Sequence, residues 1–169
     1  HDRMNEFIGN LIGEITPNYK VEPTKLDEAT KQRPDIVIHD EIQLKDGKYA
    51  PCYIDSMMTS VYTEANLNDV RDNKFSIFNA GKLAEKHKYD LYMNIHPELI
   101  KKGYKFLPAI FEGSGGMNAN IRHVINYFLN KKAKNDKKKF GILAHNYYIE
   151  LSIFYQKLRY KSLWNHYKL

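Results

Sequence analysis

Two short apolar runs, each with one aspartate at a matching edge, place the strongest constraint on how this 169-residue chain can fold. The first run covers residues 36–38 and follows Asp35, and the second covers residues 52–54 and precedes Asp55. An Asp-Gly dipeptide at residues 46–47 lies between them, which is typical of a hairpin turn. The runs therefore predict two antiparallel strands that bring the two aspartates side by side.

Helical and strand patterns surround this hairpin. From the apolar spacing we expect a helix over residues 4–15, a short strand over 19–21, a turn over 40–48, a long helix over 73–92, a strand over 104–111, a helix over 118–130 and a last amphipathic helix. A helix that joins two strands of one sheet usually makes them parallel. The order predicts one α/β domain with a small mixed sheet flanked by helices. Its expected parts are a core over 1–130, a basic linker over 131–139 and an added C-terminal helix over 140–169.

Composition limits the classes of function. The formal net charge is +6, which favours an acidic partner such as nucleic acid. Cys52 is the single cysteine, so an internal disulfide and a multi-cysteine zinc site are both excluded. No run approaches the roughly 18 consecutive apolar residues of a membrane-spanning helix. We expect an intracellular domain without a membrane partner and, because the first residue is His1, one that belongs to a longer polypeptide.

Two neighbouring carboxylates indicate a divalent-metal site. Hydrolysis of a phosphodiester needs a metal that polarises the phosphate, and hard carboxylate oxygens suit Mg²⁺ or Mn²⁺. Asp35 and Asp55 can supply those oxygens if their strands pair. The alternative is that Asp35 belongs to an ordinary Pro-Asp turn and Asp55 is a simple strand residue.

The reaction also needs a cation beside the metal, and its usual place two residues after the second acid holds Met57. The end of the long helix offers Lys88, which is in helical phase with Ala84 and Leu91, and Lys86, which points elsewhere. We take Lys88 as the first candidate and Lys86 as the second. The alternative is that both are solvated lysines near a helix C-terminus.

The succession of these motifs resembles the restriction-endonuclease-like domain found with reverse transcriptases of non-LTR retrotransposons, a branch of the PD-(D/E)xK nuclease superfamily. The motifs are Arg33-Pro34-Asp35, Tyr53-Ile54-Asp55, Lys86-His87-Lys88, Phe106-Leu107-Pro108 and Phe111 to Gly116. Some members carry the catalytic lysine on the helix after the second strand, as the Met57 departure requires here. The similarity covers residues 1 to about 128.

The resemblance implies a Mg²⁺- or Mn²⁺-dependent endonuclease that nicks DNA. Asp35 and Asp55 would be metal ligands, Lys88 or Lys86 the catalytic lysine, and Glu22, which matches a common Glu-Pro position, a third acid. It also implies a parent polypeptide with a polymerase, located in the nucleus if the element is eukaryotic. Glu22 could equally be a strand-terminating surface residue, and Glu112 an outer acid or a strand-end residue.

Two segments of the sequence can each be interpreted in two ways, and two other functions are compatible with the same residues. The glycines of residues 113–116 could hold a phosphate or make a tight turn, and the lysine run could hold DNA or be a solvated linker. The same acids would also serve an RNA endonuclease of the viral polymerase type, with Glu14 as an added ligand. An inactive nucleic-acid-binding module would need neither aspartate.

Overall fold

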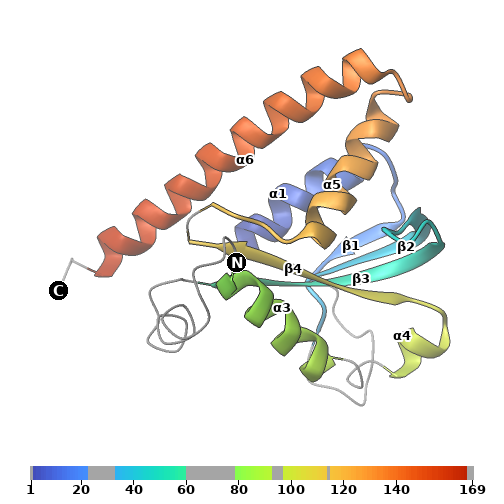
Figure 1. Cartoon of the computed structure of the whole chain (residues 1–169), viewed down its shortest axis with the longest axis horizontal. Coiled ribbons are helices and arrows are strands. Elements are labelled where there is room, and N and C mark those ends of the chain that lie inside the picture. The colour runs from blue at the N-terminus through green and yellow to red at the C-terminus, as the bar shows by residue number, and fades with distance from the viewer. Residues whose placement is uncertain (1, 23–32, 60–78, 93–96, 114, 167–169) are drawn as a thin grey trace.

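The computed structural model describes residues 2–22, 33–59, 79–92, 97–113 and 115–166 (Figure 1). In chain order its elements are α1 (Asp2–Gly13), β1 (Tyr19–Val21), β2 (Ile36–Gln43), β3 (Tyr49–Thr59), α3 (Asn79–Tyr92), α4 (Pro97–Lys101), β4 (Lys105–Glu112), α5 (Ala119–Lys132) and α6 (Lys137–His166). The chain is an α/β protein with a mixed sheet flanked by helices, as expected. The short helix α4 was not expected, and residues 73–78 of the predicted long helix lie outside the described ranges.

The sheet has the order β1-β2-β3-β4. β1 pairs with β2 and β2 with β3 in antiparallel fashion, whereas β3 and β4 run parallel. Both the expected hairpin and the expected parallel pairing are therefore confirmed. Two parallel neighbouring strands need a connection that crosses a face of the sheet. Helix α3, which lies between β3 and β4 in the chain, therefore packs on a face of the sheet and not at the sheet edge (Figure 1).

The hairpin differs from the prediction at its distal end, because β2 continues past Asp40, where we expected a turn. The pairing register with β3 shifts between Ile38 and Ile42, which marks a β-bulge. Asp40 lies in this irregular stretch and accepts hydrogen bonds from the Thr16 hydroxyl and from Asn18 Nδ2. These bonds lower the pKa of Asp40 and hold the carboxylate outside the ladder. The polar residue therefore marks a bulge, and the turn comes later.

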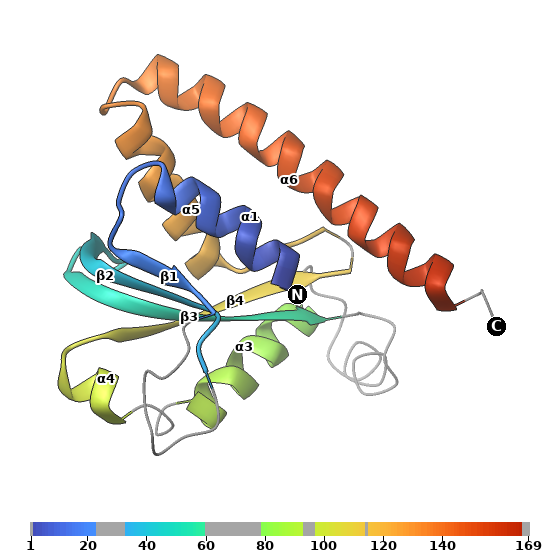
Figure 2. The ribbon, with the colours of Figure 1, turned by 180° about the vertical axis from the view of Figure 1, so that it is seen from behind.

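The main hydrophobic core lies on the face of the sheet covered by α1, α5 and α6 (Figure 2). The strands contribute alternate residues to it, including Ile36, Ile38 and Ile54, all fully buried. Each such side chain stabilises the fold by about 2 kcal/mol relative to an exposed one. The core positions on the helices are Met4, Ile8, Leu11, Ile12, Ile121, Val124, Ile125, Phe128, Leu129, Leu151 and Tyr155.

The other face of the sheet is covered by α3 and α4 and carries a much smaller apolar cluster. Val37, Tyr53 and Leu99 are its buried members, and Phe106 packs against them. The Phe106 ring stacks on the ring of Tyr92 from α3, with centroids 5.1 Å apart. The buried carboxylates Asp35, Asp55 and Glu112 lie in the same layer, so the sheet separates them from the main core.

Asn118 closes the outer edge of β4. Its Nδ2 donates to the Pro108 carbonyl at 2.8 Å, and its Oδ1 accepts from the Ile110 N–H at 3.2 Å, as a neighbouring strand would do. The same Oδ1 accepts from the Ile121 N–H at the start of α5. One buried side chain therefore protects an edge strand and caps a helix.

The glycine segment between β4 and α5 forms a tight turn. The Gly115 N–H donates to the Glu112 carbonyl at 2.8 Å, and the Gly113 N–H donates to the Thr59 carbonyl at 2.7 Å. Gly115 has φ +97°, a conformation that L side chains rarely adopt. Since these amides bond within the protein, the segment fits the interpretation as a turn better than that as a phosphate cradle.

The lysine run is mostly helical, so the linker predicted over 131–139 is wrong in its extent. α5 continues through Lys132, α6 begins at Lys137, and only residues 133–136 connect them. The Asp136 carboxylate accepts from the N–H groups of Lys138 and Lys139, which caps α6. Lysine is a good helix former. The positive charges of the lysines at the end of α5 also interact favourably with the negative end of the helix dipole.

We predict that Asn118→Ala lowers the free energy of unfolding by about 3 kcal/mol, because it leaves a buried N–H and a buried C=O without partners and removes a helix cap. Urea unfolding followed by circular dichroism measures this change. Asn130→Ala is the matched control, since Asn130 is exposed and bonds only Asn135 among the described residues. We expect the control to change stability by less than about 0.5 kcal/mol. Equal effects of the two substitutions would contradict the role given to Asn118.

Candidate functional site

The pairing of β2 and β3 places Asp35 opposite Asp55. Ile36 pairs with Ile54 and Val37 with Tyr53, and one further step in this antiparallel register brings the two aspartates together. Successive side chains alternate between the faces of a sheet, so both aspartates lie on the face of Val37 and Tyr53, toward α3. They are 8% and 4% exposed. The strand pairing thus buries two carboxylates side by side, as the sequence predicted.

Asp35 is held by the backbone of the neighbouring strand. The Ser56 N–H donates to Asp35 Oδ2 at 2.6 Å, and the Asp35 N–H donates to the Ile54 carbonyl at 2.9 Å. The Ser56 hydroxyl in turn donates to Asn5 Oδ1 of α1 at 2.6 Å. Hydrogen bonds to a carboxylate are the stronger kind, so the orientation of Asp35 is set by β3.

The crossover helix α3 supplies a cation to the pair. Lys88 Nζ contacts Asp55 Oδ2, and the two side chains are 15% and 6% exposed. The sheet-facing side of α3 includes Gly81 and Ala84, which are buried. We expected Leu91 on the same side, but it is 48% exposed. The helix is therefore rotated slightly from the predicted phase, and Tyr92 takes the inner position.

Tyr92 completes the group and was missed in the sequence. It lies one helical turn after Lys88, whose Nζ is 5.0 Å from the centre of the Tyr92 ring. Burial raises the pKa of the Tyr92 hydroxyl, and the charge of Asp55, a hydrogen bond to Asp55 and the charge of Asp35 raise it further. Tyr92 thus stays protonated at neutral pH and serves as a neutral hydrogen-bond donor. Its i+4 spacing from Lys88 was the available signal.

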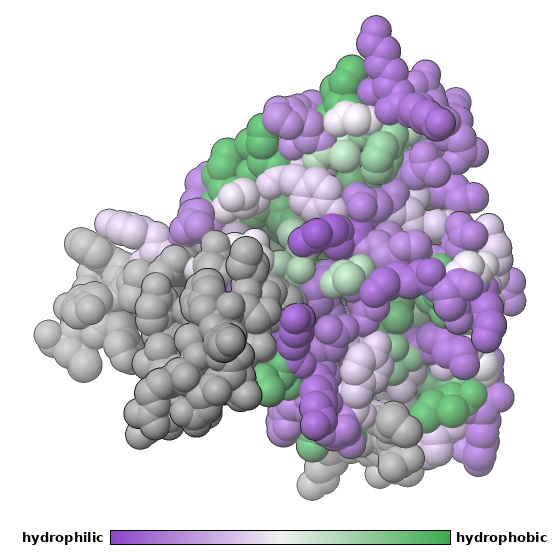
Figure 3. Space-filling view, in the orientation of Figure 1, coloured by the Kyte–Doolittle hydropathy of each residue, from purple (hydrophilic) through white to green (hydrophobic). Residues whose placement is uncertain are grey.

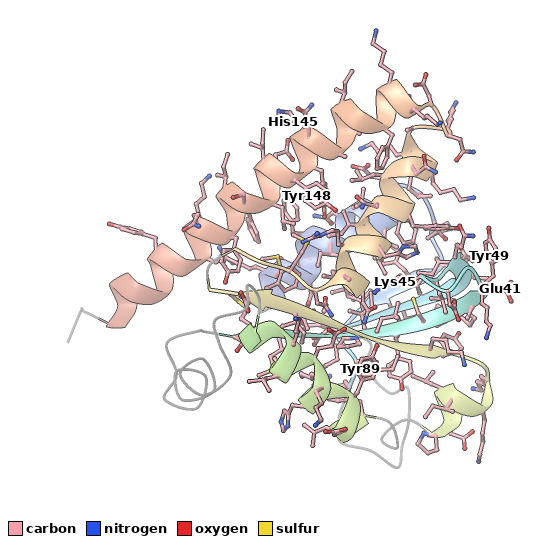
Figure 4. All side chains as sticks on the ribbon, in the orientation of Figure 1. Glu41, Lys45, Tyr49, Tyr89, His145 and Tyr148 are labelled. Atoms are coloured by element: carbon pink, nitrogen blue, oxygen red, sulfur yellow. The ribbon has the colours of Figure 1, made fainter. Side chains whose placement is uncertain are left out.

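A second polar network lies beside the first, where α3 faces the β4 edge. Glu85 Oε1 accepts from Asn118 Nδ2 at 3.0 Å and from Asn120 Nδ2 at 2.8 Å. Asn120 Nδ2 also donates to the Tyr89 hydroxyl at 3.0 Å, and Figure 4 shows Tyr89 between α3 and the sheet. These bonds join α3 to the start of α5 and so fix the helix that carries Lys88.

The other candidate residues differ from this group in burial or in position. Lys86 is on the exposed side of α3. Glu22 adjoins Asp35, since the Glu22 N–H donates to the Asp35 carbonyl at 2.6 Å, but its side chain is exposed and its φ is +46°. Glu112 lies about 13 Å further along the sheet and accepts from the Gly81 N–H at 2.8 Å. The structure therefore brings together Asp35, Asp55 and Lys88.

Glu14 and the lysine run lie on the opposite face of the sheet. Glu14 follows α1 and pairs with Lys132 of α5, in the layer above the main core. The rest of the run surrounds the connection between α5 and α6, which lies on the other side of the sheet from α3 (Figure 1). The aspartates are on the α3 side. A nucleic acid that touched both the lysine run and Asp55 would have to bend around the sheet.

Two neighbouring carboxylates are groups that could hold a divalent cation. Two carboxylates meet one ammonium, which leaves one negative charge in a partly buried group. Among the described residues, no three His, Cys, Asp or Glu side chains converge as ligands of one ion. Mg²⁺ is often held by only one or two carboxylates together with water and substrate phosphate, so the donor set fits this ion or Mn²⁺.

Comparison with protein-family models, with curated proteins and with solved structures finds no match to this chain. Within the described part of the chain, no helix is long and apolar enough to cross a membrane. A proposal about function therefore rests on the geometry of the site.

We predict that Lys88→Met lowers the free energy of unfolding by about 3 kcal/mol, because it leaves Asp55 buried beside Asp35 without a counter-charge. The matched control Lys86→Met removes an exposed lysine two positions away and should cost less than about 0.5 kcal/mol. Combining Lys88→Met with Asp55→Asn should recover part of the loss, since an amide needs no counter-charge. The double-mutant cycle consists of the wild type, Lys88→Met, Asp55→Asn and the double variant, each unfolded with denaturant. If the two single losses add up in the double variant, the Lys88–Asp55 contact is not energetically coupled.

Proposed function

We propose that this chain is a metal-dependent endonuclease with a restriction-endonuclease-like fold, of the kind found with reverse transcriptases of non-LTR retrotransposons. One observation carries the proposal: two paired strands and the crossover helix that follows them bring Asp35, Asp55 and Lys88 together. The three residues come from segments 20 and 33 positions apart, and they are the residue types that phosphodiester hydrolysis requires. The order of elements from α1 to α5 supports the same assignment.

Asp35 and Asp55 would hold a Mg²⁺ or Mn²⁺ ion. When bound, such an ion polarises the phosphate and makes a water molecule more acidic. The chain's part is to hold the carboxylates rigidly, which the Ser56 N–H does for Asp35, and to keep both in reach of one ligand. Glu22 lies next to Asp35 at the end of β1, and its exposed carboxylate could add a third acid if it turned toward the pair.

Lys88 has two roles in this proposal. Without substrate its ammonium neutralises Asp55, and with substrate it would move to the phosphate or the attacking water and stabilise negative charge there. Tyr92 beneath the ammonium limits where the lysine can go. Arg33 is exposed just before Asp35 and could contact the phosphate backbone of DNA.

A cleavage assay tests the proposal directly. We predict that the purified chain cleaves supercoiled plasmid with Mg²⁺ or Mn²⁺ and does not cleave it with a chelator. Asp35→Asn and Asp55→Asn should abolish cleavage, and Lys88→Met should reduce the rate about 100-fold or more, because each removes a group that stabilises the transition state. Single-stranded DNA and RNA substrates in parallel reactions identify the preferred nucleic acid.

Two controls make the outcome clear. Lys86→Met should keep the rate within a few-fold of the wild type, and circular dichroism must show that every variant is folded. Metal binding measured by calorimetry should be lost in the aspartate variants and retained in Lys88→Met. Cleavage that survives in both aspartate variants would refute the proposed mechanism.

An inactive module that binds nucleic acid is the second candidate. The direct contact of Lys88 with Asp55 favours it, because a lysine engaged with a carboxylate also suits a purely structural pair. Salt-dependent DNA binding that needs neither aspartate, without cleavage, would identify this case. The RNA-endonuclease alternative loses its added ligand, since Glu14 pairs with Lys132 on the opposite face of the sheet.

A further inference from the structure

The positive charge of the chain is concentrated in one short segment. The whole chain has 26 Lys and Arg residues against 20 Asp and Glu residues, and six of the former but one of the latter lie within residues 131–139. Outside this segment the two signs therefore nearly cancel. The segment forms the end of α5, the connection and the start of α6, and we call it the α5–α6 tip. Figure 3 shows hydrophilic surface at this end of the two helices.

Most lysines of the tip are not neutralised by the protein. Lys131 Nζ lies 5.5 Å from the centre of the Tyr127 ring, and Lys132 pairs with Glu14. The other lysines are exposed and form no ion pair with a described residue: Lys134, Lys137, Lys138 and Lys139. Asp136, the one acid of the segment, directs its carboxylate to N–H groups in the first turn of α6. Four like charges thus stand close together, and an anion would relieve their repulsion.

The connection holds these lysines on a well-defined turn. Asn130 Nδ2 donates to Asn135 Oδ1 at 3.0 Å, and the Asn135 N–H donates to the Asn130 carbonyl at 3.1 Å. Lys134 has φ +55° and follows the C-cap residue Ala133, a position where helices usually place glycine. The chain therefore carries a lysine where the backbone favours glycine, which supports a role for the charge of this residue.

The tip is far from the aspartate pair. Asn118 Nδ2 bonds the carbonyl of Pro108, which is the β4 residue that pairs with Asp55. From Asn118, α5 extends about 20 Å to Lys132, at about 1.5 Å per residue. The tip also lies on the other side of the sheet from α3 (Figure 1). A ligand of the tip therefore occupies a surface of its own.

We propose that the α5–α6 tip is a nucleic-acid-binding surface, separate from the aspartate site, that contacts the phosphate backbone without reading sequence. Lysine is a point charge on a flexible stem, and its contacts with phosphates carry no information about the bases. Consecutive residues of α6 point about 100° apart, so about three of the four lysines can reach one backbone. A nucleic acid at Asp35 and Asp55 rests on the proposed function, and the tip then holds a different segment of it.

The surroundings of the tip favour nucleic acid over a membrane or an acidic protein. Helices that bind membranes place apolar side chains beside their basic residues, but Phe140 packs against the main core. Ile142 is exposed one turn further, but one isoleucine buries too little area to anchor a helix in a bilayer. Lysine is depleted in protein–protein interfaces. A duplex, in contrast, carries about one negative charge per 1.7 Å of its axis and binds through such charges alone.

Fluorescence anisotropy of a labelled DNA duplex of about 20 base pairs tests the proposal, with a chelator present so that no metal-dependent step contributes. The wild-type chain should bind at low salt, and log affinity should fall against log salt with a slope of about −3, since each phosphate contributes about 0.9. Lys138→Gln combined with Lys139→Gln should weaken binding about tenfold and reduce the slope by about 2. Arginine at both positions should retain the binding, because the charge is kept.

The matched control is Lys157→Gln combined with Lys161→Gln, which removes two exposed lysines about 30 Å away on the same helix. It should leave the affinity within about twofold of the wild type, and circular dichroism should show the same helix content in all variants. Absence of binding by the wild type at low salt would overturn the proposal, as would equal effects of the two double glutamine variants. Stronger binding to phosphatidylserine vesicles or to polyglutamate than to the duplex would also overturn it. None of these outcomes depends on cleavage, so the nuclease assignment is tested separately.

Discussion

The parallel pairing of β3 with β4 is the constraint on which the rest of the structure depends. Two parallel neighbours cannot be joined by a hairpin, so the chain must cross a face of the sheet between them, and α3 is part of that crossing. The crossing helix α3 places Lys88 against Asp55, which lies on β3. A single topological requirement thus produces the contact between residues 33 positions apart. The contact also compensates for the burial of a carboxylate that would otherwise be costly.

The sheet divides the molecule into two layers with different tasks. One layer, built from α1, α5 and α6, holds the main apolar core and supplies most of the burial energy. The other, built from α3 and α4, has a small apolar cluster and leaves room for buried polar groups. Because stability comes mostly from the first layer, the second can hold two like charges in a partly dry environment. Asn118 links the layers, since it caps α5 and also donates to Glu85 of α3.

Much of the fold could be predicted because its patterns are local. The hairpin follows from two apolar runs around an Asp-Gly turn, and the aspartate pair follows from their register. The errors came from contacts over long distances. The bulge at Asp40 depends on Thr16 and Asn18, more than 20 residues earlier. The phase of α3 depends on how Tyr92 stacks on Phe106, which left Leu91 exposed. Periodicity within one helix carries no information about either partner.

The sequence by itself predicted most of the strands and helices, that two aspartates meet, and that a lysine of the helix after the second strand could lie beside them. These predictions follow from the periodicity of apolar residues and from the spacing of charged residues along the chain. Only the tertiary structure decided which lysine reaches Asp55, that Tyr92 lies beneath it, and that the lysine run is on the far side of the sheet. The physical reason is that rotation of a helix and the face it covers are set by packing between elements, which a linear pattern does not encode.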